Sequence, residues 1–249
     1  MRGSVIFCFI CMKYIVMPLP FFYSEHISPV GAVFVLDDAT ARHVTQVLRM
    51  KKGERLCVTD GKGKKCIGVI EEQHKKGCTV YIENESDVPA QQPRITVAIS
   101  LLKNASRFEW LREKCTEIGV GSVVPLICER TERSHFRYER MKSIVLSAML
   151  QSQQCWLPKL PEPVHFKDWI SRAGSGVKYI AHCLDTEKNT LTGSAPAGDK
   201  LICIGHEGDF TPAEIDMALH HQFKPVSLGN TRLRTETAGI AAAILLRIR

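Results

Sequence analysis

The residues best suited to chemistry gather near the end of the chain, where two arginines precede a helix of small side chains. Arg232 and Arg234 lie in a loop after a short apolar run, and Thr235 and Glu236 open the helix. Cations beside a helix N-terminus favour an anion, because the first amide groups of a helix lack intrahelical acceptors. Ala and Gly at 238, 239 and 241–243 allow close backbone approach. Taken alone, the segment is more often a C-terminal amphipathic helix with a basic lead-in.

A second segment, residues 201–215, predicts a buried strand, a glycine loop and a helix. Thr211 is a natural N-cap, Pro212 suits the first helical position, and Glu214 completes a capping box. Gly205 and Gly208 let the backbone turn sharply and approach a ligand. This construction is general to cofactor-binding folds. As a bare pattern it is also a common way of turning a corner.

In this order and spacing, the two segments resemble the knotted SPOUT methyltransferases, and more closely the ribosomal small-subunit RNA methyltransferase E family. Gly205-His-Glu-Gly-Asp-Phe210 stands where the family carries Gly-Pro-Glu-Gly-Gly-Phe. Leu228-Gly-Asn-Thr-Arg-Leu-Arg-Thr-Glu-Thr-Ala238 stands where it carries Leu-Gly-x-x-Ile-Leu-Arg-Thr-Glu-Thr-Ala. The resemblance extends from residue 17 to the end, with further similar stretches at 43–49, 60–63, 101–110, 113–120 and 151–158. His206 replaces the usual Pro, Asp209 a Gly, and Gln154 the usual Arg.

Apolar runs divide the chain into two units. Between residues 32 and 87, short β-prone runs alternate with Gly and Lys turns around one helix near 38–48, which indicates a small β-barrel. After a linker at 89–93, strands and helices alternate, which predicts an α/β fold with a parallel sheet. The predicted strands are 95–101, 122–127, 179–184, 201–204 and 224–228; the predicted helices are 106–118, 138–153, 212–221 and 235–249.

The resemblance names these units. It implies that residues 17–88 are a PUA-like RNA-binding β-barrel domain and that residues 94–249 are a SPOUT methyltransferase domain with a C-terminal trefoil knot. Residues 1–16 precede the similar region, and Met17 is interpreted as the natural start. The preceding segment is then an over-extended gene prediction, with a real disordered extension as the alternative.

The resemblance also implies S-adenosylmethionine as the cofactor, bound in loops that follow buried strands. Apolar side chains of those loops can sandwich the adenine ring, and backbone groups can read its edge. Carried over by position, the candidate cofactor-binding residues are Leu184, Ile204, Gly205, Glu207, Gly208, Leu228, Gly229, Asn230, Leu233, Arg234, Thr235, Glu236, Thr237 and Ala238.

The family methylates N3 of a uridine in the decoding region of 16S rRNA, and that nitrogen must lose its proton before it attacks. A cation near O2 or O4 stabilises the developing anion; Arg234 is the first candidate and Arg232 the second. Glu207 or Glu236 can accept the proton. Because a Glu at a helix start more often caps the helix or pairs with an Arg, we favour capping for Glu236, with Arg234 as a candidate partner.

A net charge of +7 favours a polyanionic partner, although a mildly basic protein without one is an alternative. The resemblance implies 16S rRNA or the small ribosomal subunit as that partner, a homodimer, and a cytoplasmic location with no membrane contact. Trp156 is expected to fill the core rather than stack on a base. The candidate RNA-binding residues are Arg49, Lys62, Lys64, Lys103, Arg107, Lys114 and Arg130.

The ten cysteines are scattered and mostly lie in apolar runs, which is typical of reduced thiols in the cytosol. The single CxxC, at residues 8–11, has no second pair, so no metal site is expected. Two other functions compete with the methyltransferase. One is a non-catalytic RNA-binding or ribosome-assembly factor that retains the knotted fold. The other is a nucleotide-binding enzyme, which ranks last because both common phosphate-loop motifs are missing.

Overall fold

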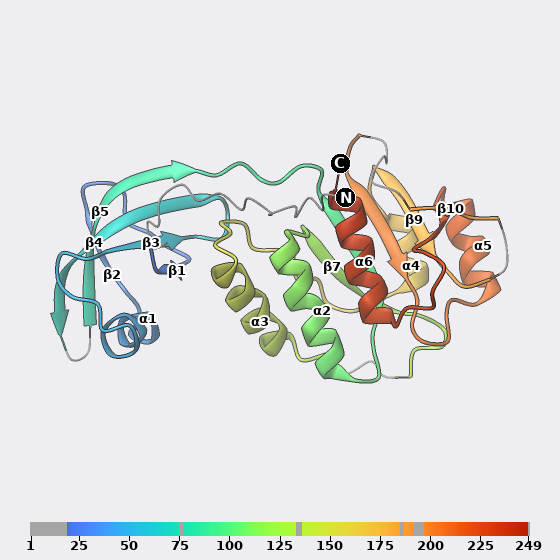
Figure 1. Ribbon diagram of the computed structural model, residues 1–249, viewed down its shortest axis with the longest axis horizontal. Helices are drawn as coiled ribbons and strands as arrows, with labels where there is room; N and C mark the ends of the chain where they lie inside the picture. Colours follow the sequence, from blue (N-terminus) through green and yellow to red (C-terminus); the bar gives the residue numbers. More distant parts are fainter. Residues whose placement is uncertain (1–18, 75–76, 133–135, 185–186, 192–196, 249) are drawn as a thin grey trace, which may run out of the picture.

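The computed structural model describes residues 19–74, 77–132, 136–184, 187–191 and 197–248. The prediction for residues 1–16 and the basic turn at 75–76 therefore lie outside the described residues. The chain forms two units joined by a linker: a curved β-sheet unit and a larger α/β unit (Figure 1). Among the described residues, none of the helices has the length and apolar character needed to cross a membrane.

The N-terminal unit is a five-stranded sheet in the order β1-β3-β4-β5-β2. Its strands are β1 (Phe21–Tyr23), β2 (Val33–Val35), β3 (Arg55–Thr59), β4 (Lys64–His74) and β5 (Gly77–Asp87). The helix α1 (Asp38–Arg42) continues into the π-helix η1 (His43–Val47), and Ala41 and Val44 pack against the core of the sheet. β1 and β2 do not pair within the described residues, so the sheet there is curved but open.

The larger unit is a seven-stranded parallel sheet in the order β10-β12-β9-β11-β6-β7-β8, which confirms the predicted α/β class. The strands are β6 (Ile95–Ser100), β7 (Ser122–Ile127), β8 (Val164–His165), β9 (Val177–Ala181), β10 (Asn189–Thr190), β11 (Lys200–Ile204) and β12 (Lys224–Ser227). All five residues of β11 are buried, since this strand lies between β6 and β9 and is covered on both faces.

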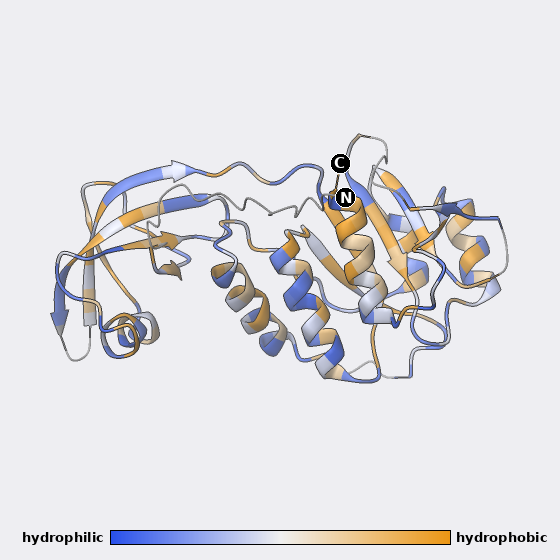
Figure 2. Ribbon diagram, in the orientation of Figure 1, coloured by the Kyte–Doolittle hydropathy of each residue, from blue (hydrophilic) through white to orange (hydrophobic). Residues whose placement is uncertain are grey.

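Helices cover both faces of this sheet. The helices are α2 (Ala105–Ile118), α3 (Tyr138–Gln151), α4 (Phe166–Arg172), α5 (Pro212–His220) and α6 (Thr235–Arg247). One core contains α2 and α6, the other α4 and α5. Figure 2 shows α6 as largely apolar, whereas α2 and α3 alternate polar and apolar positions. The predicted helix signals are confirmed: Gly119 closes α2 in a left-handed conformation (φ 83°), and Thr211 and Glu214 form the capping box of α5.

The small residues of α6 do bring its backbone close to other elements. A Cβ on Gly239 would lie 2.8 Å from Leu111 of α2 and 2.9 Å from Ile99 of β6. We therefore expect Gly239→Leu to lower the free energy of unfolding by about 3 kcal/mol through overpacking, despite the better helix propensity of leucine. Urea denaturation measures this change. Thr237→Leu, an exposed position on the same helix, is the control and should change stability by less than about 0.5 kcal/mol. Equal losses at both positions would contradict the packing argument.

Backbone pairing joins the two units. The Gly63 amide donates to the Cys155 carbonyl (2.9 Å) and the Leu157 amide to the Gly61 carbonyl (2.8 Å). Trp156 lies between these two bonds, and the prediction that it fills the core is wrong. Its ring packs against Gly63, the residue is 38 % exposed, and the indole N–H donates to the Val88 carbonyl at 2.7 Å. The alternation of an extended segment places Cys155 inside and Trp156 outside.

Candidate cofactor cavity and charged rim

A cavity of about 410 Å³ lies at the carboxyl ends of β9, β11 and β12, which are neighbours in the sheet. Loops that follow adjacent parallel strands meet at one edge, which is where α/β folds bind ligands. Of the sequence-predicted residues, eight cofactor candidates and one catalytic candidate line it: Ile204, Gly205, Leu228, Gly229, Asn230, Leu233, Thr235, Ala238 and Arg232. Six others lie near it in sequence but not among its lining: Leu184, Glu207, Gly208, Arg234, Glu236 and Thr237.

The loop after β11 is shaped by Asp209 more than by its glycines. Asp209 has φ 63°, whereas neither Gly205 nor Gly208 has a positive φ, so the left-handed backbone of this loop falls on Asp209. Gly208 is needed for space instead, because a Cβ there would lie 2.5 Å from the His206 ring. The Asp209 carboxylate accepts from the Cys183 amide (2.5 Å) and the Phe210 amide (2.8 Å). It thereby ties the β11 loop to the β9 loop.

The β9 loop contributes residues that the sequence analysis missed. His182 is 8 % exposed, lines the cavity, and its Nδ1 has no partner among the described residues. Lys188 also lines the cavity, and its ammonium donates to the carbonyls of His182 (3.1 Å) and Leu184 (2.5 Å). Leu184, the residue chosen from this loop, contributes that carbonyl while its side chain is 39 % exposed. The resemblance pointed to the loop, but no sequence signal distinguished its members.

Charged residues gather beside the cavity, around Glu207. Arg107 of α2 lies 3.7 Å from the Glu207 carboxylate and 3.6 Å from that of Glu236. Arg130 donates to the Gly208 carbonyl at 2.6 Å. The guanidinium of Arg232 donates to the Glu207 carbonyl at 3.4 Å. Three arginines from three segments therefore hold one side of the β11 loop.

Glu236 does not cap α6 as predicted. No side chain caps this helix, and the buried Glu236 pairs with Arg107 rather than with Arg234. Its second oxygen has no partner within the described part of the chain. Arg234 is the N-cap residue of α6; it is exposed, and no ion pair joins it to a described residue. Its guanidinium is therefore available at a helix N-terminus, beside the cavity lined by Leu233 and Thr235.

The predicted RNA-binding residues fall into separate groups. Lys103 and Arg107 line an open depression at the start of α2, of about 580 Å³, together with Glu207. Arg130 lies near this group through its bond to Gly208. Lys114 pairs with Glu113 and Glu117 further along α2. The remaining three, Arg49, Lys62 and Lys64, belong to the N-terminal unit, where Lys64 pairs with Glu85 at 2.8 Å.

Metal chemistry receives no support from the described residues. They contain no group of three or more His, Cys, Asp or Glu side chains that could hold an ion. Their eight cysteines are all free thiols, seven of them buried. The cavity is thus built from loops, apolar walls and a few polar groups, an arrangement suited to an organic ligand.

Comparison with known proteins identifies this architecture as that of an RNA methyltransferase. The chain matches the RNA methyltransferase domain family over residues 89–247 and the RNA methyltransferase PUA domain family over residues 36–83. It is 31 % identical over 223 residues to the ribosomal RNA small subunit methyltransferase E of Synechocystis, covering 86 % of this chain and 72 % of that relative. The chain therefore belongs to the ribosomal RNA small subunit methyltransferase E family.

Solved structures agree with this assignment. A probable rRNA-methyltransferase from Porphyromonas gingivalis has a TM-score of 0.84 and 38 % identity, with 91 % of this chain and 96 % of that chain covered. The ribosomal RNA small subunit methyltransferase E of Neisseria gonorrhoeae, bound to S-adenosyl methionine, has a TM-score of 0.82 and 29 % identity, with 91 % and 95 % covered. The N-terminal sheet is accordingly a PUA-like domain.

Proposed function

We propose that this chain transfers a methyl group from S-adenosylmethionine to N3 of a uridine in the decoding region of 16S rRNA, on the small ribosomal subunit. The observation that carries the proposal is the cavity at the ends of β9, β11 and β12. It is built by the two segments that carry the family resemblance together with the loop that follows β9. Similarity to S-adenosyl methionine-bound relatives supports the choice of cofactor.

The residues of the cavity fit this cofactor. Ile204, Leu228 and Leu233 provide apolar walls for an adenine ring, and the backbone of the adjoining loops provides donors and acceptors. The Nδ1 of buried His182 has no partner among the described residues, and a polar group of the ligand would satisfy it. S-adenosylmethionine supplies an electrophilic methyl group on a sulfonium, so towards the cofactor the chain binds it, orients it and excludes water.

The charged residues beside the cavity would act on the uridine. Arg234, with no partner among the described residues, would stabilise the negative charge that develops on the uracil oxygens. Glu207 is the candidate proton acceptor, held in place by Arg107. Arg232 lines the cavity and is assigned the second cationic role. Glu236, buried against Arg107, is proposed to position that arginine rather than to move a proton.

Acid pH should weaken cofactor binding through His182. Burial lowers the pKa of His182, the Lys188 charge lowers it further, and Asp209 opposes the change. A lowered pKa means that the folded state favours the neutral His182 ring. The contribution of this neutral ring to stability is therefore complete above about pH 6.5 and is lost as the pH falls through the folded pKa. A protonated ring would also repel the sulfonium. Calorimetry between pH 7.5 and about 5.5 should show the Kd for S-adenosylmethionine rising by less than about tenfold, the limit that an unshifted pKa of about 6.5 would give. His182→Gln should flatten this profile; an unchanged profile would refute the role.

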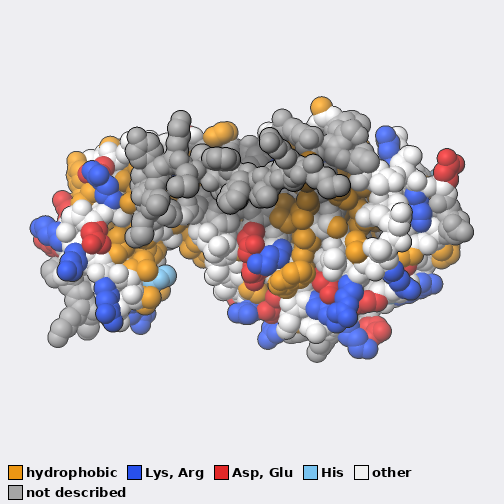
Figure 3. Space-filling model, viewed as in Figure 1, with side chains coloured by type: hydrophobic (Ala, Val, Ile, Leu, Met, Phe, Trp, Pro, Cys, Tyr) orange, Lys and Arg blue, Asp and Glu red, His pale blue; other side chains and the backbone are white. Residues whose placement is uncertain are grey.

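We also propose the finer features of the architecture. Residues 17–88 and 94–249 are the two domains, the C-terminal segment forms the trefoil knot, and two copies associate through α2 and α6. Exposed apolar side chains on that face support the homodimer: Trp110 on α2 is 45 % exposed and Ile244 on α6 is 41 % exposed. Apolar side chains gather there between α2 and α6 (Figure 3).

Two measurements test the function together. The first is calorimetric titration of S-adenosylmethionine into the protein. The second is transfer of labelled methyl groups to small subunits that lack the modification, with the product nucleoside located at N3 of uridine by mass spectrometry. Binding and transfer to a single uridine are the expected results. RNA binding without cofactor binding would instead assign the chain as a non-catalytic assembly factor, and transfer to another base or atom would overturn the proposed target.

A further inference from the structure

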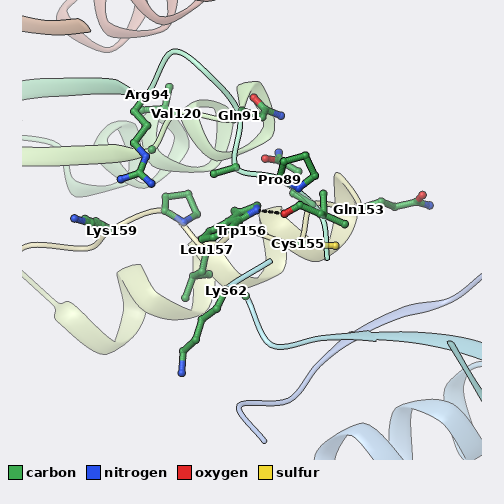
Figure 4. Close-up of a pocket in the computed structure, with 17 residues that line it drawn as sticks. Lys62, Pro89, Gln91, Arg94, Val120, Gln153, Cys155, Trp156, Leu157 and Lys159 are labelled. Atoms are coloured by element: carbon green, nitrogen blue, oxygen red, sulfur yellow. Dashed lines mark hydrogen bonds between the residues drawn. The ribbon is translucent and has the colours of Figure 1, made fainter. Parts of the chain in front are cut away.

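A second cavity, of about 400 Å³, lies where the two units meet (Figure 4). It is lined by residues 61–62 of the N-terminal unit, by the linker, and by residues 119–121 and 153–159 of the larger unit. Arg94 and Gly121 adjoin the amino ends of β6 and β7, whereas the cofactor cavity lies at carboxyl ends of the same sheet. The six residues of β6 separate the two edges by about 20 Å.

Trp156 forms the centre of this cavity and is held rigidly. Its indole N–H is bonded to the Val88 carbonyl, and one edge of the ring packs on Gly63, where a Cβ would lie 2.5 Å from Cζ2. The residue nevertheless remains 38 % exposed. A fixed aromatic surface that is open to solvent is a stacking platform, because ordering of the side chain adds no further cost on binding.

The charges around Trp156 have one sign. Lys62, Arg94 and Lys159 line the cavity, are exposed, and form no ion pair with a described residue. No acidic side chain occurs among the described residues of the lining. In Figure 4 the Arg94 and Lys159 ends lie to one side of the Trp156 ring, the Gln153 amide extends on the other, and the Lys62 side chain extends below the ring. Cations beside an aromatic platform match a single strand of nucleic acid, with its phosphates next to an unstacked base.

Gln154, where the family usually has an arginine, is not part of this recognition. Its amide donates to the carbonyls of Thr116 (2.7 Å) and Glu117 (3.1 Å) at the end of α2. The side chain therefore secures the loop that presents Trp156, and the cations that remain free are Lys62, Arg94 and Lys159.

We propose that this interdomain cavity anchors one unstacked nucleotide of the RNA substrate. Trp156 stacks on the base, and Lys62, Arg94 and Lys159 contact the phosphates on either side. This inference rests on the proposed RNA substrate and adds a contact remote from the methylated uridine. Since the anchor lies at the opposite edge of the sheet, it contributes to RNA binding and not to the chemical step.

Substitutions at Trp156 separate stacking from structure. Trp156→Leu should raise the KM for small subunits about tenfold, with kcat and the Kd for S-adenosylmethionine unchanged. Trp156→Phe keeps the aromatic face and loses the bond to Val88, so its KM should remain within about threefold of the parent. Leu219→Ala is the control: Leu219 is 41 % exposed on α5, outside the PUA-like unit, and its loss should leave KM unchanged.

Direct measurement of RNA binding tests the role of Trp156 independently of catalysis. A fluorescein-labelled single-stranded RNA of about twelve nucleotides should bind Trp156→Leu about tenfold more weakly than the parent. Lys62→Gln combined with Lys159→Gln should reduce the slope of log affinity against log salt by about 1.4.

Unchanged RNA affinity in Trp156→Leu, or equal losses in the Leu and Phe variants, would overturn the proposal. A changed sedimentation coefficient with unchanged RNA affinity would overturn it in favour of a contact between copies. If the parent protein bound no S-adenosylmethionine or transferred no methyl group, the proposed function would be refuted, and the RNA anchor would still be tested by the binding measurements.

Discussion

Arg234→Ala is expected to lower kcat for methyl transfer by about 100- to 1000-fold, the usual effect of removing one preorganised group that stabilises developing charge. Arg234 is the N-cap residue of α6, is exposed, and pairs with no described carboxylate. Its charge is therefore uncompensated and adds to the partial positive charge of the helix N-terminus. Because Arg234 does not line the cofactor cavity, the Kd for S-adenosylmethionine should change by less than about threefold.

Arg232→Ala is the comparison that makes this result specific. Arg232 lines the cofactor cavity and bonds to the Glu207 carbonyl, so its removal should raise the Kd for S-adenosylmethionine as well as lower kcat. Single-turnover methyl transfer and calorimetry on both variants provide the two quantities. If Arg234→Ala weakened cofactor binding by the same factor as it lowered kcat, Arg234 would hold the cofactor instead. If its kcat were normal, the charge that assists the uridine must come from another residue.

Asp209→Ala is expected to raise the Kd for S-adenosylmethionine about 30-fold. Alanine at φ 63° costs about 1 kcal/mol, and loss of a charged acceptor for the amides of Cys183 and Phe210 costs a further 1.5–3 kcal/mol, reduced by partial exposure. The loops that follow β9 and β11, which both line the cavity, would no longer be tied. Calorimetry gives the Kd, and circular dichroism checks that the variant is folded.

Two further variants divide this effect between strain and bonding. Asp209→Gly restores the residue of the family pattern, removes the strain and still lacks the carboxylate, so its Kd should lie between those of the parent and Asp209→Ala. Asp209→Asn tolerates the left-handed conformation and keeps one acceptor, and its Kd should stay within about fivefold of the parent. A Kd for Asp209→Ala equal to that of the parent would show that the loops remain in place without this carboxylate.

The sequence predicted the larger helices and several strands of the α/β unit because their signals are local. The strand at 122–127 has the predicted bounds, and the capping residues of α5 occupy their expected positions. The elements β1, β8, α4 and β10 were missed; of these, β8 and β10 have two residues each and exist only through pairing with β7 and β12. No propensity within two residues can indicate such a strand.

For the site, spacing located the loops but not their members. Leu228, Gly229 and Asn230 were placed through a contiguous motif and do line the cavity. His182 and Lys188 come from a loop without a motif, and only the sheet order β12-β9-β11 brings it beside the others. The partner of Glu236 was misassigned for the same reason: Arg107 is 129 positions away in sequence and reaches it because α2 packs on α6.

The distribution of thiols gives this protein a built-in chemical reporter. Burial raises the pKa of Cys57, Cys115 and Cys128 to about 12, which leaves those sulfurs protonated and unreactive at neutral pH. Cys183 is the exposed thiol among the described cysteines, and it lines the cofactor cavity. With Cys8 and Cys11 replaced by serine, an alkylating dye should label one position on the folded chain. The rate of that labelling would then measure cofactor occupancy directly, without RNA, radioactivity or turnover.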